Sequence, residues 1–201
     1  MTTKTARPDG RSARGERTRD AVVDAFLTLA DEGHLRPTAR QISERAGVSI
    51  RSVFQHFEDL ETLFATAADH QVERLRPLTV EIDPDAPFDD RIAQFTKARC
   101  AILERVSPVR RAALLAAPFS EVLAERLRWS RQMNREELQR VFANELASFP
   151  AARRRLVLAS LHSCTDWYTW ETLRVHSNLS FEDAVKTMSL TVRSLLKKEA
   201  R

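Results

Sequence analysis

The chain has 201 residues, of which 43% are hydrophobic and 30% are charged, and its formal net charge is +4 at pH 7. This length allows one domain of ordinary size or two small ones, each with a hydrophobic core. No run of about 18 uncharged apolar residues occurs, which excludes a transmembrane helix. The N-terminus lacks the apolar stretch of a secretory signal, so we expect a cytoplasmic protein with no membrane partner.

The positive charge is concentrated at the N-terminus. Residues 1–19 contain six of the 32 basic side chains and two of the 28 acidic ones, so the remaining 182 residues carry 26 of each. Basic arms of this kind bind nucleic acid phosphates or enter a minor groove. A solubilising tail would have the same composition. We predict that residues 1–15 form a flexible basic arm.

The hydrophobic pattern is helical along nearly the whole chain. Apolar residues recur at intervals of three and four, only four glycines are present, and no strand-like alternation occurs beside a turn pair. We therefore predict an all-α fold. The first helix is expected from about Glu16 to Asp31, and Gly33 follows where a C-terminal cap is expected.

The segment "TARQISERAGVSIRSVFQHF" contains two short helices separated by a tight turn. Thr38 and Gln41 have the spacing of a capping box at the start of the first of them. This helix is expected to end at Gly47. Ser49 is then the cap of a helix that runs over about residues 50–57.

The rest of the chain is predicted from the same periodicity and from the positions of proline. A loop is expected around Pro77, Pro84 and Pro87. The predicted helices are a fourth from Asp59 to about Leu75, one over residues 88–106, a short one between Pro108 and Pro118, a long one from Ser120 to Pro150, and two terminal ones over about Ala152–His176 and Phe181–Lys198.

Two short capped helices joined by a tight turn are typical of a helix-turn-helix motif, whose second helix enters the DNA major groove. The outer side of the second helix carries Arg51, Ser52, Gln55 and His56. These residue types hydrogen-bond base edges and phosphates. The alternative is a pair of core helices that happen to meet at a glycine turn. We favour DNA binding.

The segment from Arg17 to about His70 resembles the tetracycline-repressor (TetR) family of bacterial transcriptional regulators. The resemblance rests on a first helix ending near a glycine, on "TARQISERAGVS", on an aromatic residue in the third helix, on "HF", and on "LETLF" at the start of the fourth. The C-terminal "WETLRVHSNLSFEDAVKTMSLTVRSLL" is also similar to the last two helices of this family. The resemblance implies a homodimer with an N-terminal three-helix DNA-binding domain and a C-terminal helical domain for ligand binding and dimerisation.

On this basis, residues 16–58 are the DNA-binding domain, residues 59–76 a connecting helix, and residues 77–201 the regulatory and dimerisation domain. The resemblance implies that Thr38 and His56 contact phosphates. It also implies a set of residues that face the major groove: Ser49, Ile50, Arg51, Ser52 and Gln55.

Three positions depart from the family pattern. Phe54 stands where the family usually has a tyrosine whose hydroxyl contacts the DNA backbone, and Leu60 stands where a lysine commonly binds phosphate. Both changes remove a phosphate donor, which would weaken DNA affinity and flatten its salt dependence. Arg51 replaces a residue that is often small, and with the basic arm it would offset this loss.

The terminal helices are predicted to form the dimer interface. The first of them is apolar around most of its circumference, so it has to be covered on more than one side. A second copy of the chain would supply the missing cover. The predicted interface residues are Trp167, Val185, Met188, Val192 and Leu195.

A ligand pocket is predicted in the region of residues 88–170, because pockets are mostly apolar with a few polar anchors. For each candidate, ordinary core packing is the alternative. The resemblance implies that a small, mainly apolar effector shifts the fourth helix and releases a repressor from its operator; activation, or a corepressor, is the other possibility. The candidate residues are Phe95, Cys100, Phe119, Trp129, Met133, His162, Asp166 and Trp170.

An enzyme is disfavoured by the same sequence. The four glycines cannot form a phosphate-binding loop, and the five histidines lack metal-ligand spacing with one another or with the cysteines. His162 and Cys164 lie two residues apart on a helix, so they point to different faces and cannot act as base and nucleophile. We expect no catalytic residue, no metal and no cofactor. A helical adaptor protein is the other alternative, but it would explain neither the capped motif nor the basic arm.

Overall fold

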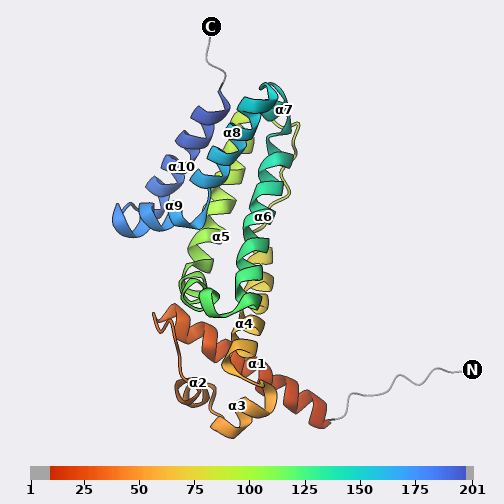
Figure 1. Cartoon of the computed structure of the whole chain (residues 1–201), viewed down its shortest axis with the longest axis vertical. Coiled ribbons are helices and arrows are strands. Elements are labelled where there is room, and N and C mark those ends of the chain that lie inside the picture. Colours follow the sequence, from red (N-terminus) through yellow and green to blue (C-terminus); the bar gives the residue numbers. More distant parts are fainter. Residues whose placement is uncertain (1–9, 198–201) are drawn as a thin grey trace, which may run out of the picture. The chain divides into compact units, whose positions relative to one another are not determined.

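The structure is a computed structural model that describes residues 10–197, with side chains from Ala13 onward. Every regular element in this range is a helix (Figure 1). The predicted all-α fold class is therefore confirmed. None of the helices in the described range is long and apolar enough to cross a membrane.

The chain divides into two compact units, which do not follow the predicted domain limits. The first unit extends to Glu73 and also includes Pro108–Leu123, whereas the second consists of Arg74–Ser107 and the residues from Ala124 onward. Pro108–Leu123 was predicted to lie in the regulatory domain. It belongs to the first unit because of contacts that are distant in sequence, including the bond from the Arg36 guanidinium to the Leu115 carbonyl.

The N-terminal part of the first unit consists of four helices, α1 (Gly10–Asp31), α2 (Ala39–Ala46), α3 (Ile50–His56) and most of α4 (Leu60–Leu75), and Pro108–Leu123 adds the end of one helix and the start of another. The core of this unit is apolar, and the rings of Phe26 and Phe64 pack with their centroids 4.8 Å apart. Buried side chains come from all four helices: Val22, Phe26, Leu27, Ile42, Val53, Leu63 and Phe64.

Helix α1 starts at Gly10, six residues before the predicted start at Glu16. Residues 10–15 were predicted to belong to the flexible arm, and this part of the prediction is wrong; residues 1–9 lie outside the described range. Gly10 and Gly15 lie in this stretch, but a glycine inside a helix costs only about 1 kcal/mol relative to alanine. The long helix that follows outweighs this cost.

The remaining helices run mostly through the second unit. Two short 3-10 turns, Arg76–Leu78 and Ala117–Phe119, also occur. The helices are α5 (Phe88–Ala116), α6 (Glu121–Val141), α7 (Ala143–Ala147), α8 (Ala151–Cys164), α9 (Trp167–Glu171), the π-helical segment η3 (Thr172–His176) and α10 (Phe181–Leu196).

Helix α5 continues through Pro108, where the sequence predicted a break between two helices. A proline inside a helix costs about 3 kcal/mol because it lacks an N–H donor and crowds the preceding turn. Leu103, Val109 and Ala112, on either side of it, are buried. Burying a single large apolar side chain contributes about 1.5–3 kcal/mol, so packing outweighs the proline.

Helix α8 ends at Cys164, although one helix was predicted over Ala152–His176. The Arg99 Nε donates to the Thr165 carbonyl (2.9 Å), and the Asn134 Nδ2 donates to the Thr165 hydroxyl (3.0 Å). The Asp166 carboxylate then accepts from the Trp167 N–H (2.7 Å) and starts α9. The long predicted helix over Ser120–Pro150 is likewise divided into α6 and α7.

Candidate nucleic-acid interface

Helix α2 and the turn after it have the predicted caps. The Thr38 hydroxyl accepts from the Gln41 N–H (3.3 Å), and the Gln41 side chain accepts from the Thr38 N–H (2.9 Å). Gly47 has a φ of 68°, in the left-handed region where glycine is strongly favoured. This conformation ends α2 and lets the chain reach Ser49 within two residues.

Helix α3 is held by a cap at its start and by two buried side chains. The Ser49 hydroxyl accepts from the Ser52 N–H (3.1 Å), and Val53 and Phe57 are buried. Because successive residues of a helix are about 100° apart, the side opposite Val53 and Phe57 carries Arg51 and Gln55. Both of these side chains are exposed.

The two flanks of α3 differ in chemistry. One flank carries Ile50 and Phe54, both of which are exposed, and the other carries Ser52 and His56, both half-buried. Helix α3 therefore presents an exposed polar row, formed by Arg51 and Gln55 and called the crest below, between an apolar flank and a polar flank. The predicted phosphate contact Thr38 is exposed at the start of α2.

Most of the other arginines near this surface are already engaged. Arg40 pairs with Glu44 (2.8 Å) on α2, and Arg45 pairs with Glu32 (2.5 Å). The bond from Arg45 lowers the pKa of the Glu32 carboxyl. Within the described residues, Arg51 has no ion-pair partner. Its guanidinium is the one of these groups that is available to an external acceptor.

The basic N-terminal segment contributes to this surface only in part. Arg19, which the sequence placed with the excess charge, lies over the Phe57 ring (5.1 Å from its centroid) and donates to Thr66 (3.3 Å). It therefore joins α1 to the core of the first unit. Arg14 and Arg17 are exposed on α1.

The start of α4 agrees with the predicted cap and with the predicted departure from the family. The Asp59 carboxylate accepts from the Thr62 N–H (2.7 Å), and hydrogen bonds from Thr62 lower the pKa of this carboxyl. Leu60 is exposed beside it. The side chain at position 60 therefore offers an apolar surface and no donor to a phosphate.

The eight predicted ligand residues do not line either of two surface hollows of the second unit, which have volumes of about 460 and 450 Å³. Four of the eight have evident structural roles or are simply exposed: the Phe95 ring packs on Phe142, Asp166 caps α9, and Phe119 and Trp129 are exposed. Phe119 also belongs to the first unit. The predicted ligand site as a whole stays a prediction.

Among the described residues of the second unit, two buried side-chain polar atoms lack hydrogen bonds. The Oδ1 atom of the buried Asn134 and the Nε2 atom of the half-buried His162 are shielded from solvent and have no partner in the structure. His162 was among the predicted ligand residues, whereas Asn134 was not. Asn134 could not be recognised from the sequence, because a polar residue on a highly charged helix is usually exposed.

The two cysteines are poor nucleophiles. Both are free thiols, and burial raises the pKa of Cys100 to about 12 and that of Cys164 to about 11. The thiolate is the reactive form of cysteine, so both side chains stay unreactive at neutral pH. The buried Cys100, which was a candidate ligand residue, lies 3.6 Å from the Met188 sulfur.

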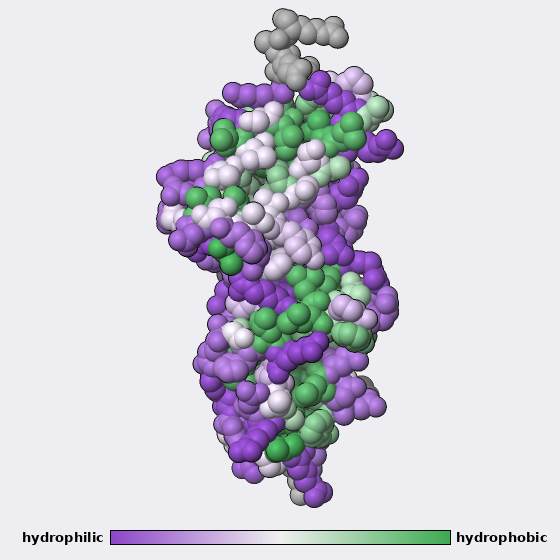
Figure 2. Space-filling model, turned by 60° about the vertical axis from the view of Figure 1, so that its left-hand side comes forward, coloured by the Kyte–Doolittle hydropathy of each residue, from purple (hydrophilic) through white to green (hydrophobic). Residues whose placement is uncertain are grey.

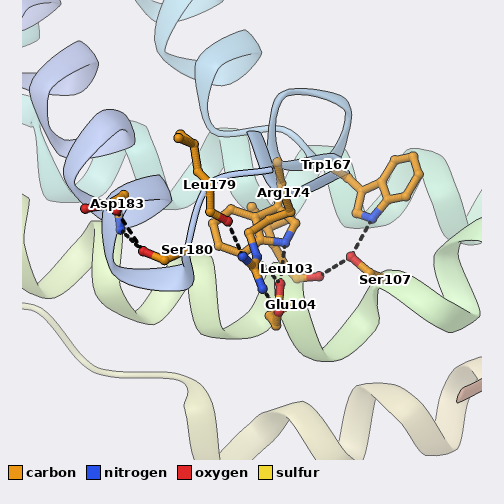
Figure 3. A network of polar contacts seen from close by, with 9 residues as sticks. Leu103, Glu104, Ser107, Trp167, Arg174, Leu179, Ser180 and Asp183 are labelled. Atoms are coloured by element: carbon orange, nitrogen blue, oxygen red, sulfur yellow. Dashed lines mark hydrogen bonds and ion pairs between the residues drawn. The ribbon is translucent and has the colours of Figure 1, made fainter. Parts of the chain in front are cut away.

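Three predicted dimer residues are buried within the single chain. Met188 and Val192 lie in the core between α10 and its neighbours, and the Trp167 indole N–H donates to the Ser107 hydroxyl (3.0 Å; Figure 3). This chain already covers all three, and their assignment to a dimer interface stays a prediction. Val185 and Leu195 are half-buried.

The apolar groups that remain uncovered on α8 and α10 are different residues. Leu156 is 63% exposed on α8, and Leu190 is 65% exposed on α10. Figure 2 shows apolar and weakly polar residues gathered on the side of the second unit that carries these helices. A hollow on this side is lined largely by small polar and apolar residues, among them Ser160, Ser163, Thr187, Thr191 and Leu195.

A polar network fixes the segment after α8 against α5 (Figure 3). The Glu104 carboxylate accepts from the Trp170 indole N–H (3.0 Å) and from Arg174 (2.8 Å), and Arg174 also donates to the Leu179 carbonyl. Trp170, which was a predicted ligand residue, is therefore a buried structural residue. The sequence did not predict this role because Glu104 is 66 positions away.

Several solved structures of transcriptional regulators have a fold similar to that of this chain. No family model and no curated protein matches the sequence. A transcriptional regulator from Rhodococcus sp. RHA1 has 22% sequence identity and a TM-score of 0.68, covering 90% of this chain and 95% of its own. A TetR-family transcriptional regulator from Streptomyces coelicolor has 17% identity and a TM-score of 0.67, covering 93% and 80%. A TetR-like transcriptional regulator, also from Rhodococcus sp. RHA1, has 18% identity and a TM-score of 0.58, covering 97% and 100%.

Proposed function

We propose that this chain, which has the fold of TetR-family transcriptional regulators, is a homodimeric repressor that a small molecule releases from a palindromic operator. The observation that carries the proposal is the crest of α3. Arg51 and Gln55 are exposed there, while Val53 and Phe57 anchor the opposite side in a rigid core. A short helix presented in this way fits the second helix of a helix-turn-helix motif.

The chemistry of the crest suits a major groove. An arginine can donate two hydrogen bonds to a guanine edge, and a glutamine can pair with an adenine edge; each good pair is worth about 1–3 kcal/mol of base discrimination. Thr38 and His56 would hold phosphates around this contact, with Ser49 and Ser52 also facing the groove. Exposed Arg14 and Arg17 on α1 add positive charge.

Base readout is tested with Arg51→Ala. After selection of a binding sequence from random duplexes, the variant should lose its preference at one position of each half-site and keep its affinity for non-specific DNA. Arg128→Ala, an exposed arginine of the second unit, is the matched control and should bind as the parent does. If the parent chain selects no sequence at two salt concentrations, it is an adaptor and the proposed function is wrong.

The dimer would form through the outer faces of α8 and α10. Leu156 and Leu190 are the large apolar side chains that a partner would cover, with Val185 and Leu195 beside them. A two-fold interface uses the same patch on both chains, so four helices would meet there. A two-fold dimer reads two half-sites in adjacent major grooves, about 34–36 Å apart, which accounts for a palindromic operator.

The interface is tested by placing a charge on each exposed leucine. Leu156→Glu and Leu190→Glu should yield a folded monomer in sedimentation, because a buried unpaired charge opposes association. Leu115→Glu is the matched control: it changes an exposed leucine of the first unit and should leave the dimer intact. A stable Leu190→Glu dimer would place the interface elsewhere.

Effector control would act through the helices that contribute to both units. Helix α5 passes from the second unit into the first at Pro108, and α6 passes from the first into the second at Ala124. An effector bound in the second unit can shift an equilibrium only through its differential affinity for two states, and a 100-fold difference corresponds to about 2.7 kcal/mol. We expect a mainly apolar molecule, with Asn134 and His162 as its polar anchors.

The sign of regulation is tested directly. Small molecules that raise the melting temperature of the protein are screened again for release of the selected duplex, which is the expected result. Asn134→Ala and His162→Ala should lower the affinity for such a molecule and leave DNA binding unchanged. A molecule that stabilises the protein and tightens DNA binding would instead identify a corepressor-controlled switch.

A further inference from the structure

The reading helix exposes two large apolar side chains beside its polar crest. Ile50 is 45% exposed and Phe54 is 48% exposed, although both lie on a helix of only seven residues. They are four residues apart, so they share one flank of α3. Arg51 and Gln55, also four apart, form the parallel polar row next to them.

This flank has only apolar chemistry to offer. Phe54 has no hydroxyl, so its ring cannot hydrogen-bond a phosphate, and Ile50 has no polar atom in its side chain. Single exposed apolar residues are ordinary on protein surfaces. Ile50 and Phe54, however, lie beside the polar row that we assign to base contacts, so they would enter the major groove together with that row. In the major groove, the apolar group of a base pair is the C5-methyl of thymine.

We propose that Ile50 and Phe54 read thymine methyl groups, and that the operator half-site carries thymines next to the bases that Arg51 and Gln55 contact. This inference rests on the proposed function, because it requires α3 to enter the major groove. The two rows of α3 then recognise different features of the base pairs. The polar row reads hydrogen-bonding edges, and the apolar row reads methyl groups that lack any hydrogen-bonding capacity.

The size of the effect follows from the burial of one methyl group. Burying a CH₂-sized group contributes about 0.8 kcal/mol, which corresponds to about fourfold in affinity for one thymine. Replacing the same thymine in both half-sites should therefore weaken binding about 15-fold. Uracil is the right replacement, because it keeps the base-pair hydrogen bonds of thymine and lacks only the methyl group.

The experiment uses the full chain and the duplex that it selects from a random pool. Each thymine of the selected site is replaced by deoxyuridine, symmetrically and one position at a time, and the dissociation constant is measured by fluorescence anisotropy at fixed salt. Every duplex is also measured with Phe54→Ala and Ile50→Ala. Phe54→Leu keeps an apolar side chain, and Val72→Ala, a change at an exposed apolar residue of α4, is the matched control.

The expected result is that at least one deoxyuridine duplex binds the parent chain and Val72→Ala about 15-fold more weakly, and that Phe54→Ala or Ile50→Ala does not distinguish it from the thymine duplex. Phe54→Leu should retain part of the discrimination. If the parent binds all deoxyuridine duplexes as it binds the thymine duplex, or if both alanine variants discriminate as fully as the parent, the inference is wrong while the proposed function stands. If the random pool yields no selected sequence, both fail, and the flank is then a protein-contact surface.

Discussion

The two units of this protein each contain an ion pair of an arginine and a glutamate, and the two pairs differ in burial. In the first unit Arg40 and Glu44 are 79% and 62% exposed. The second unit also has exposed pairs, but its Arg91–Glu145 pair is internal, with side chains only 5% and 18% exposed. The Arg40–Glu44 pair thus faces solvent, whereas the Arg91–Glu145 pair joins helices to one another.

The difference matters for function. A surface that reads DNA needs polar groups whose hydrogen bonds are not used within the protein, and the crest of α3 has them in Arg51 and Gln55. Internal polar contacts do the reverse and fix one arrangement of helices. The Arg91 guanidinium donates to the Val141 carbonyl (2.7 Å) as well as to Glu145 (2.6 Å), so it joins α5 to α6 and α7. The four predictions below test this contrast.

The largest effect is expected from Arg91→Ala. Removing one partner of a buried pair leaves the other charge without compensation, which costs about 3–5 kcal/mol. Arg40→Ala, the matched change in the exposed pair, should cost far less, because solvent screens this pair. Urea unfolding gives both values. All three tryptophans lie in the second unit, so their fluorescence follows that unit, while far-UV circular dichroism follows the whole chain.

Equal costs for these two variants would contradict the contrast between the units. Coincident fluorescence and circular dichroism curves would in addition show that the two units unfold together. Curves that separate in Arg91→Ala alone would show that the second unit is the one that this arginine stabilises.

A smaller loss is expected from Thr165→Val. The buried Thr165 hydroxyl donates to the Leu161 carbonyl (2.8 Å) and accepts from Asn134 (3.0 Å). Valine keeps the volume and leaves the Asn134 amide without an acceptor, which should cost about 1–3 kcal/mol. Thr28→Val in α1 is the control, since the exposed Thr28 hydroxyl bonds only the Asp24 carbonyl within its own helix. A neutral Thr165→Val would show that the break between α8 and α9 does not depend on this residue.

Features of the structure that depend on neighbouring residues could be predicted from the sequence, whereas features that depend on distant residues could not. The caps of α2 and α3 were predicted correctly because Thr38 and Ser49 bond residues only three positions away. The break at Thr165 was not predicted, because Arg99 and Asn134, which hold it, lie 66 and 31 positions earlier. Periodicity shows that a helix face is covered, but it does not show which element covers it.

The same reasoning applies to the predicted dimer residues. Trp167 and Met188 are large apolar residues on helices with broad apolar faces, and sequence alone does not tell intrachain from interchain cover. The structure assigns them to the core and leaves Leu156 and Leu190 uncovered. For α3, in contrast, a helix of seven residues that is anchored by the buried Val53 and by the buried Phe57 at its C-terminal cap has only one way to face outward. The predicted reading residues therefore lie on or beside its exposed side.

Loss of a helix cap should have an intermediate effect of about 1 kcal/mol. Ser49→Ala removes the cap of α3, and Ser180→Ala removes the corresponding cap of α10, where the Ser180 hydroxyl accepts from the Asp183 N–H (3.1 Å). Both should lower the urea midpoint by similar amounts. Only Ser49→Ala should also weaken specific DNA binding in anisotropy, since α3 presents the reading residues. A loss of DNA affinity in Ser180→Ala would contradict this assignment.

The smallest effects are expected in the pH dependence of stability, and their signs differ between two glutamates of the second unit. The bond from Arg91 lowers the pKa of Glu145. The unfolded chain then binds a proton at higher pH than the folded chain, so this stabilisation is present above about pH 4.3, the ordinary glutamate value, and is lost as the pH falls further. Burial raises the pKa of Glu137, so its effect on stability runs the other way with pH. The stabilisation that it contributes is present below about pH 4.3 and is lost as the pH rises through the pKa of the folded state.

Glu145→Gln should therefore flatten the loss of stability toward acid in urea unfolding between about pH 6 and pH 3. Glu137→Gln should raise stability most at neutral pH, and Glu32→Gln, in the exposed pair of the first unit, should change the profile less than Glu145→Gln because solvent screens it. A larger change from Glu32→Gln would mean that the surface pairs of the first unit stabilise it as much as the internal contacts stabilise the second.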